Sequence, residues 1–289
     1  YGDYMIFWIA SYPKSGNTWL RSLISTYYFT KDGIYDERLL KKIDQFPTRK
    51  YFLDFKYDPK IIGDTCRFWI SAQEKLNTDK KLKFFKTHNA FGKVNNFDFT
   101  NSENSIGCIY IVRDPRNVIT SVMNHYELDE NKAFKWMTNE KQFIYDVEKV
   151  KQFGFSDFQF ISSWQLNYKS WFVQKKIKTK FIRYEDLSNQ TYLVFKEIID
   201  FINKTIQSNE KINLPKLKKT INSTSFEKMK KKETENGFSE AINSQKNKNK
   251  KITFFNLGPN NDWKKILNIK LRNRLNEKFK TDLKELSYI

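Results

Sequence analysis

Four short apolar runs, each followed by a polar loop and then by a helical pattern, constrain the fold of this 289-residue chain most strongly. Each run is rich in β-branched or aromatic residues and is apolar on both faces, which is typical of a buried parallel strand. The runs cover residues 5–11, 82–86, 106–112 and 180–184. This alternation predicts an α/β fold with a doubly wound central parallel sheet, flanked by helices, that binds ligands at the carboxyl ends of its strands.

Helices are predicted where apolar residues recur at helical spacing after these strands. The predicted helices cover residues 18–29, 115–125, 130–150, 160–175, 187–202 and 264–279. Neither an internal repeat nor a second-domain boundary is visible, so we expect one domain over residues 1–289. Residues 228–251 differ because they are polar and rich in Lys and Asn, and we expect them to form a mobile surface loop.

The balance of charge favours anionic partners, because 52 Lys and Arg residues outnumber 33 Asp and Glu residues and leave a formal net charge of +19. Such a surface suits a nucleic acid, an anionic membrane, an anionic glycan or a polyphosphate cosubstrate. A general preference for Lys on the surface explains the excess equally well. Net charge therefore does not identify the ligand.

Cysteine and histidine are scarce, which argues against a disulfide framework or a metal site. The chain has two cysteines, Cys66 and Cys108, and two histidines, His88 and His125. No apolar stretch approaches the ~20 residues of a membrane span, and no signal peptide is recognisable. We therefore expect a soluble cytoplasmic protein without a metal. The sequence starts at Tyr1 rather than at Met, which leaves room for an upstream segment.

The loop after the first predicted strand has the parts of an anion cradle. Gly16 lets the backbone approach a ligand closely, and the free N–H groups of the following helix carry the positive end of its dipole. Lys14 adds a full charge, and Ser15 and Thr18 add hydroxyl donors. The loop is P-loop-like but is not a Walker A motif, because Lys14 precedes the glycine and no Gly-Lys-Ser/Thr sequence occurs.

A second cationic turn follows the third predicted strand and begins at Arg113. A guanidinium group can bind phosphate with two hydrogen bonds, although an Arg here serves equally well in an ion pair. Ser121 lies just over two helical turns further on and can face the same side. The second predicted strand leads into Lys86-Thr87-His88, and a His88 kept neutral by Lys86 suits a general base.

Together these segments resemble the sulfotransferases that use 3′-phosphoadenosine 5′-phosphosulfate (PAPS), in particular the soluble type. Residues 12–19, Tyr-Pro-Lys-Ser-Gly-Asn-Thr-Trp, are similar to the family's 5′-phosphosulfate loop, with Asn17 where Thr is usual. Arg113 and Ser121 are similar to its 3′-phosphate site, and Lys86-Thr87-His88 is similar to its catalytic triplet. The similar segments follow the family's order across nearly the whole chain.

The resemblance implies a role for each of these residues. The expected ligands of the 5′-phosphate are Lys14, Ser15, Gly16, Asn17 and Thr18. Trp19 is expected to stack on the adenine, and the adenine side is expected to be completed by Tyr184, Phe226 and Met229, with Gly258 retained from the family's closing segment.

That closing segment departs from the family where two cations usually contact the 3′-phosphate, because Asn256 and Leu257 stand at these positions. The loss of two charged partners predicts weaker PAPS binding unless other cations replace them. The candidates for replacement are Lys246, Lys248, Lys250 and Lys251. The family's dimerisation pattern is not met either, because Asn268 and Asn273 stand at its Thr and Glu positions.

The resemblance implies direct in-line transfer of a sulfuryl group from PAPS to a hydroxyl, or less commonly an amine, with adenosine 3′,5′-bisphosphate (PAP) as product. His88 is the expected base, and Lys14 and Lys86 are expected to stabilise the growing charge. Neither a metal nor a covalent intermediate is required. We expect a small-molecule or glycan acceptor, held by the loops at 32–80, 89–103 and 228–251, and no specific nucleic acid.

Two other functions remain open at this point. A P-loop phosphotransferase needs a nucleoside triphosphate and Mg²⁺, whereas a non-catalytic polyanion-binding protein uses only the basic surface. The second function gives no reason for Lys86-Thr87-His88 to stand between two anion loops. A sulfotransferase should bind PAP in preference to ATP–Mg²⁺, whereas a P-loop phosphotransferase should show the opposite preference.

Overall fold

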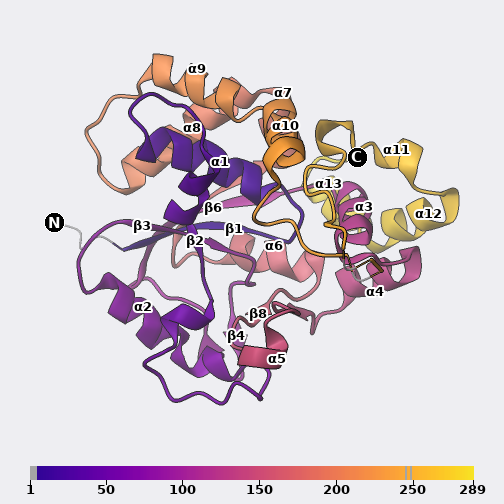
Figure 1. Ribbon diagram of the computed structural model, residues 1–289, viewed down its shortest axis with the longest axis horizontal. Helices are drawn as coiled ribbons and strands as arrows, with labels where there is room; N and C mark the ends of the chain where they lie inside the picture. The colour runs from indigo at the N-terminus through magenta and orange to yellow at the C-terminus, as the bar shows by residue number, and fades with distance from the viewer. Residues whose placement is uncertain (1–4, 245, 248) are drawn as a thin grey trace.

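Figure 1 shows the computed structural model, which describes residues 5–244, 246–247 and 249–289. Its centre is a parallel sheet with the strand order β2-β3-β1-β6-β9. The strands are β1 (Ile6–Ser11), β2 (Asp44–Gln45), β3 (Lys83–Thr87), β6 (Ser105–Val112) and β9 (Lys178–Arg183). The predicted α/β class and parallel sheet are confirmed, and the four predicted strands begin and end within two residues of their expected bounds.

Helices cover both faces of the sheet, which explains why the central strands are apolar throughout. Successive side chains of β1 point to opposite faces. Phe7 and Ile9 pack with α1 (Asn17–Phe29) and α8 (Thr191–Thr205), whereas Trp8 packs with α6 (Trp164–Val173). In Figure 1, α1 and α8 accordingly lie on one side of the sheet and α6 lies on the other.

The remaining elements surround this core. Two short antiparallel pairs join β4 (Lys93–Val94) to β5 (Phe97–Asp98) and β7 (Phe143–Ile144) to β8 (Gln159–Phe160). The other α-helices are α2 (Trp69–Asn77), α3 (Pro115–Tyr126), α4 (Glu130–Thr138), α5 (Val150–Phe153), α7 (Tyr184–Asn189), α9 (Leu214–Ser223), α10 (Phe226–Asn236), α11 (Trp263–Ile266), α12 (Ile269–Lys278) and α13 (Lys280–Glu285). The 3₁₀ turns are η1 (Glu37–Lys42), η2 (Arg49–Tyr51), η3 (Asp64–Phe68) and η4 (Gly258–Asn260).

Four predicted helices differ from the observed ones. The helix expected over 160–175 begins only at Trp164, because Phe160 belongs to β8 and pairs with β7. The helix expected over 130–150 ends at Thr138, because Asn139 is extended and the chain then enters β7. The helix expected over 264–279 is interrupted where Leu267 is extended, and the Asn268 side chain caps the new start of α12. The helix expected over 187–202 is divided between α7 and α8 at Gln190, which leaves the helical region.

The expectation of a loop over residues 228–251 is wrong for residues 228–236, which belong to α10. The Ser225 hydroxyl caps this helix by accepting a hydrogen bond from the backbone N–H of Lys228, and Met229 is buried beneath it. A single buried apolar residue among many charges produces little visible periodicity, which hid the helix.

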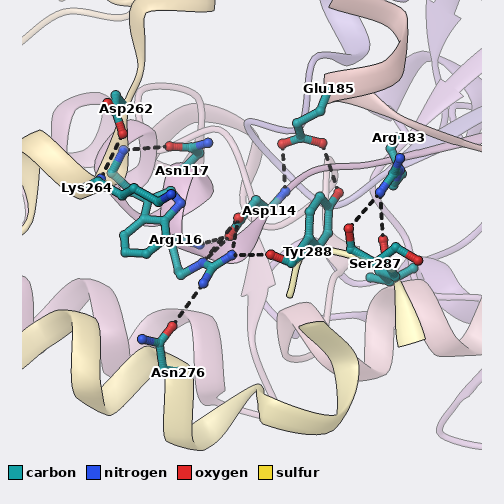
Figure 2. Close-up of polar contacts among 12 residues, drawn as sticks. Asp114, Arg116, Asn117, Arg183, Glu185, Asp262, Lys264, Asn276, Ser287 and Tyr288 are labelled. Atoms are coloured by element: carbon teal, nitrogen blue, oxygen red, sulfur yellow. Dashed lines mark hydrogen bonds and ion pairs between the residues drawn. The ribbon is translucent and has the colours of Figure 1, made fainter. Parts of the chain in front are cut away.

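A ring of polar contacts ties the last residues of the chain to the carboxyl ends of β6 and β9 (Figure 2). Asp114 caps α3 and lies 2.7 Å from the guanidinium of Arg116. Arg116 also donates to the backbone carbonyl oxygen of Tyr288, whose hydroxyl donates to Glu185 at 3.0 Å. Glu185 accepts the backbone N–H of Asp114 at 3.1 Å and closes the ring.

Candidate active site

A pocket of about 460 Å³ opens at the carboxyl ends of the central strands. It brings together nearly all residues that the sequence assigned to cosubstrate binding or catalysis, namely Lys14, Gly16, Asn17, Thr18, Trp19, Lys86, His88, Arg113, Ser121, Tyr184, Phe226, Met229 and Gly258. Ser15 is the exception, because its side chain is fully buried and its hydroxyl has no hydrogen-bond partner among the residues that the structure describes. Residues far apart in the sequence therefore form one site.

Strand order explains how these residues meet. The loop containing Lys14 follows β1, His88 follows β3, and Arg113 follows β6. These three strands are direct neighbours, with β1 in the middle. Parallel neighbours are about 4.8 Å apart and end at the same edge of the sheet, so the three groups face one another across a short gap.

The loop after β1 has a backbone that only glycine fits. Gly16 has a φ of 97°, in the left-handed region, and immediately precedes α1. A Cβ atom at this position would lie 2.5 Å from the Tyr184 ring. The ring therefore packs directly against the backbone at the start of α1, where free N–H groups favour an anion.

Asn17 uses its side chain inside the protein. Its amide donates to the backbone carbonyl oxygen of Ile9 at 3.0 Å and to the hydroxyl of Ser11 at 3.1 Å. The amide donors that we expected to face an anion are thus taken up by β1. Asn17 instead fixes the end of the strand that carries the loop.

The imidazole of His88 is held in one protonation state. Its Nδ1 atom lies 2.8 Å from the carbonyl oxygen of Ser11, and a carbonyl can only accept, so Nδ1 carries the proton and Nε2 keeps its lone pair. Burial, reinforced by the charge of Lys86, lowers the pKa of His88 to about 3. The ring is therefore a neutral base at physiological pH.

Lys14, Lys86 and Arg113 are three of the cations that line the pocket. Burial lowers the pKa of Lys14 to about 8, and it also lowers the pKa of Lys86. Arg113 lies over the Tyr184 ring at 4.1 Å and donates to the carbonyl oxygen of Gly258 at 3.3 Å. Among the described residues its buried Nε has no partner, so the guanidinium can still take an acceptor.

An aromatic wall lines the pocket beside these cations. Trp19 donates through Nε1 to the carbonyl oxygen of Thr224 at 3.0 Å and meets the Tyr184 ring edge-on at 5.8 Å. Phe226 packs so closely on Gly258 that a Cβ there would lie 2.1 Å from its ring. This wall can receive a flat heterocycle.

Glu240 is a pocket residue that the sequence did not reveal. Its carboxylate accepts a hydrogen bond from Thr18 Oγ1 at 2.7 Å and pairs with Arg21 at 2.6 Å. Its distance to Lys86 Nζ is 3.8 Å. Burial disfavours the charged carboxylate, yet Arg21 and Lys86 outweigh burial and hold the pKa of Glu240 well below its usual range. Thr18 and Glu240 are 222 residues apart, so no local pattern could join them.

His125, to which the sequence assigned no role in the site, also lines the pocket. It lies four residues after Ser121 on α3, and this spacing places both on one face of the helix. Burial, with Lys14 and Lys86 nearby, lowers the pKa of His125 to about 3. The helical spacing from Ser121 was the available signal.

The described lysines among those proposed to replace the missing cations do not line the pocket. Lys246, Lys250 and Lys251 are not among its lining residues, and Lys248 lies outside the described residues. Asn256 and Leu257 do line the pocket. Lys230, on α10, donates a hydrogen bond to the backbone carbonyl oxygen of Asn256 at 2.8 Å. It therefore places a positive charge on this stretch of backbone.

The described part of the chain offers no group of three or more His, Cys, Asp or Glu side chains that could hold a metal ion. Across residues 5–244, 246–247 and 249–289, no helix is long and apolar enough to cross a bilayer. Cys66 and Cys108 are both buried free thiols.

Sequence comparison places these features in context. The family model described as "Sulfotransferase domain" matches residues 6–287. Luciferin sulfotransferase of Photinus pyralis is 25% identical over 224 residues, which are 77% of this chain and 56% of that protein. Sulfotransferase 1E1 of Mus musculus is 26% identical over 279 residues, with 96% of this chain and 83% of that protein covered. The match thus spans little more than half of the Photinus protein.

Solved structures share the fold. Retinol dehydratase in complex with androsterone and the inactive cofactor PAP superposes with a TM-score of 0.57 at 16% identity, covering 96% of this chain and 80% of that one. A mouse sulfotransferase complexed with PAP gives a TM-score of 0.55 at 19% identity, with coverages of 96% and 84%. At these identities the likeness concerns the fold.

Proposed function

The chain belongs to the sulfotransferase domain family, and on that premise we propose that it transfers a sulfuryl group from PAPS to a hydroxyl acceptor. One observation carries the proposal: a neutral histidine, a lysine-bearing anion loop and an arginine stand at the ends of three adjacent strands and line one pocket. A general base, a site for the transferred group and a second anion site are the parts that such a reaction needs.

The residues present fit PAPS. Two buried polar groups that lack partners among the described residues, Ser15 Oγ and Arg113 Nε, belong to the two anion sites inferred from the sequence. The loop at Lys14 would hold the 5′-phosphosulfate, and Arg113 with Ser121 would hold the 3′-phosphate. Trp19 and its aromatic neighbours would hold the adenine. PAPS supplies the sulfuryl group and leaves as PAP.

The protein's part in the transfer is to move one proton and stabilise charge. Nε2 of His88 accepts the acceptor's proton as the acceptor oxygen forms its bond to sulfur and the bond from sulfur to the phosphate oxygen breaks. Lys14 and Lys86 stabilise the charge that grows on the departing oxygen. The Nδ1 bond to Ser11 keeps the Nε2 lone pair available throughout.

The acceptor that we propose is a small molecule or a glycan with a free hydroxyl. The pocket lining includes the polar side chains of Gln45, Asn124, Asp146 and Lys149, which are available to such an acceptor. Retinol dehydratase, which shares this fold, was solved in complex with androsterone, and this supports a small-molecule acceptor. The relative from Arabidopsis thaliana named cytosolic sulfotransferase 16, 23% identical over 288 residues, supports a cytoplasmic location as part of the proposal.

The decisive experiment is an acceptor screen with ³⁵S-labelled PAPS, using His88→Ala as the inactive control. We expect label in one class of hydroxyl compound with the wild-type protein and none with the variant. Thermal-shift measurements with PAP, AMP and ATP–Mg²⁺ distinguish a sulfotransferase from a P-loop phosphotransferase. Stabilisation by ATP–Mg²⁺ but not by PAP would show a phosphotransferase and overturn the proposal.

A further inference from the structure

The carboxylate of Glu240 stands where the anion loop should receive its ligand. Building on the proposed function, we propose that Glu240 is an internal competitor for the cosubstrate: it neutralises the phosphosulfate site while the site is free and must leave when PAPS binds. The chain thereby sets its own affinity for PAPS and PAP.

Thr18 makes the competition direct. Its hydroxyl has a single proton, and that proton is donated to Glu240 Oε2 at 2.7 Å. The same hydroxyl is the donor that the 5′-phosphate would need. Two anions cannot both accept this proton, and their like charges repel one another at hydrogen-bonding separations.

Glu240 reaches this position from residues 237–244, and the later residues 249–256 cover Lys14. The Lys14 ammonium lies over the Phe254 ring at 4.3 Å. Hydrogen bonds of 2.7 Å from Asn243 to Glu148 and from Ser244 to Glu127 hold the segment across the pocket. The carboxylate is therefore delivered by an anchored segment.

Arg21 makes the site ready for an incoming anion. Its side chain is 5% exposed and donates to the carbonyl oxygens of Leu40 and Ile43, so the backbone holds it whether or not Glu240 is present. When Glu240 leaves, Arg21 and Lys86 lose their shared counter-ion. An anion of higher charge then replaces the carboxylate, and this exchange drives displacement.

The test is calorimetric titration of PAP into the wild-type protein and Glu240→Gln. The amide keeps an acceptor for Thr18 and Arg21 but removes the charge, so we expect PAP to bind at least about tenfold more tightly. Glu235→Gln is the matched control, because it removes the same charge from an exposed position at the end of α10 and should change the dissociation constant by less than about twofold.

Equal or weaker binding to Glu240→Gln, with normal binding to wild type, would overturn the competitor and leave the sulfotransferase proposal standing. Absence of PAP binding to every variant would instead defeat both. Hydrogen exchange on the wild-type protein tests the same idea without a substitution. Adding PAP should speed amide exchange in the peptide containing Glu240 and slow it in the loop at Lys14, and slower exchange around Glu240 would contradict displacement.

Discussion

Nδ1 of His88 lies 2.8 Å from the backbone carbonyl oxygen of Ser11, the last residue of β1. The strand that leads into the anion loop therefore also sets the tautomer of His88, the proposed base, which directly follows the neighbouring strand β3. Asn17 reinforces this link, since its amide donates to the Ser11 hydroxyl at 3.1 Å. Base and anion loop are positioned by one piece of backbone, and a carbonyl oxygen cannot be removed by substitution of a side chain.

Replacement of His88 by Ala should remove the base without removing the cosubstrate site. We expect kcat to fall about 10²–10⁴-fold, which is the usual contribution of a positioned base. The PAP dissociation constant should stay within about threefold of wild type, because the expected phosphate ligands are elsewhere. Turnover at saturating acceptor and calorimetry with PAP provide the two measurements. Full turnover by the variant would show that His88 is not the base.

His125→Gln is the companion variant, because it removes the second imidazole from the same pocket. If His88 alone is the base, this variant should retain a kcat within about tenfold of wild type. A loss of kcat equal to that of His88→Ala would show that both histidines, rather than His88 alone, take part in removing the proton.

PAP binding should weaken at alkaline pH because burial lowers the pKa of Lys14 to about 8. Below this value Lys14 is charged and attracts phosphate, and above it the ammonium is lost. Between pH 7 and pH 9 we expect the PAP dissociation constant to rise about tenfold. Calorimetry over this range measures the rise. Lys14→Arg should flatten the profile because guanidinium stays charged, and an unchanged alkaline limb would exclude Lys14 as its cause.

The acidic side should behave differently. Since the pKa of His88 is lowered to about 3, kcat/KM should show no acidic limb near pH 6.5, where an unperturbed imidazole titrates. The rate should remain level as the pH falls from 7 to 5. A limb within that window would mean that the imidazole is more accessible to water than its burial indicates.

Much of this could be predicted because the strands and their loops are local features. β1 and β6 are apolar on both faces, β3 and β9 combine apolar residues with lysines, and the residue types at the strand ends point to the chemistry. β2 could not be found, since its two residues pair with β3 only after the chain has folded. Glu240 was missed for a related reason: its partners, Thr18 and Arg21, lie more than 200 residues earlier.

Gly16→Ala should destabilise the protein through the Tyr184 ring. A methyl group would meet that ring at 2.5 Å, and the residue has a φ of 97°. The two penalties together predict a loss of about 2–4 kcal/mol in the free energy of unfolding. Urea denaturation measures it. Gly92→Ala, where nothing lies within 4 Å of the added Cβ, should cost less than about 0.5 kcal/mol. Equal losses would show that the close packing at Gly16 is not the cause.

Arg116→Ala should cost about 3–5 kcal/mol in the free energy of unfolding, because it leaves the buried carboxylate of Asp114 without its partner. The chain contains a matched control. Asp36 and Arg38 form the same i,i+2 pair, also at 2.7 Å, but the Arg38 side chain is 86% exposed. Arg38→Ala should leave the urea midpoint unchanged. A similar shift for both variants would show that burial does not decide the strength of this pair.

The anion loop, His88 and Arg113 follow three strands that are adjacent in the sheet. This placement has a consequence for how such a protein can diversify. The spacing between these groups is set by the distance between neighbouring hydrogen-bonded strands, which no side-chain substitution alters. Mutations in the surrounding loops can therefore remodel the far wall of the pocket while the distance from base to donor stays constant. Under the proposed function, acceptor selectivity and reactivity would reside on separate parts of the chain, so a lineage could explore new acceptors without rebuilding its chemistry.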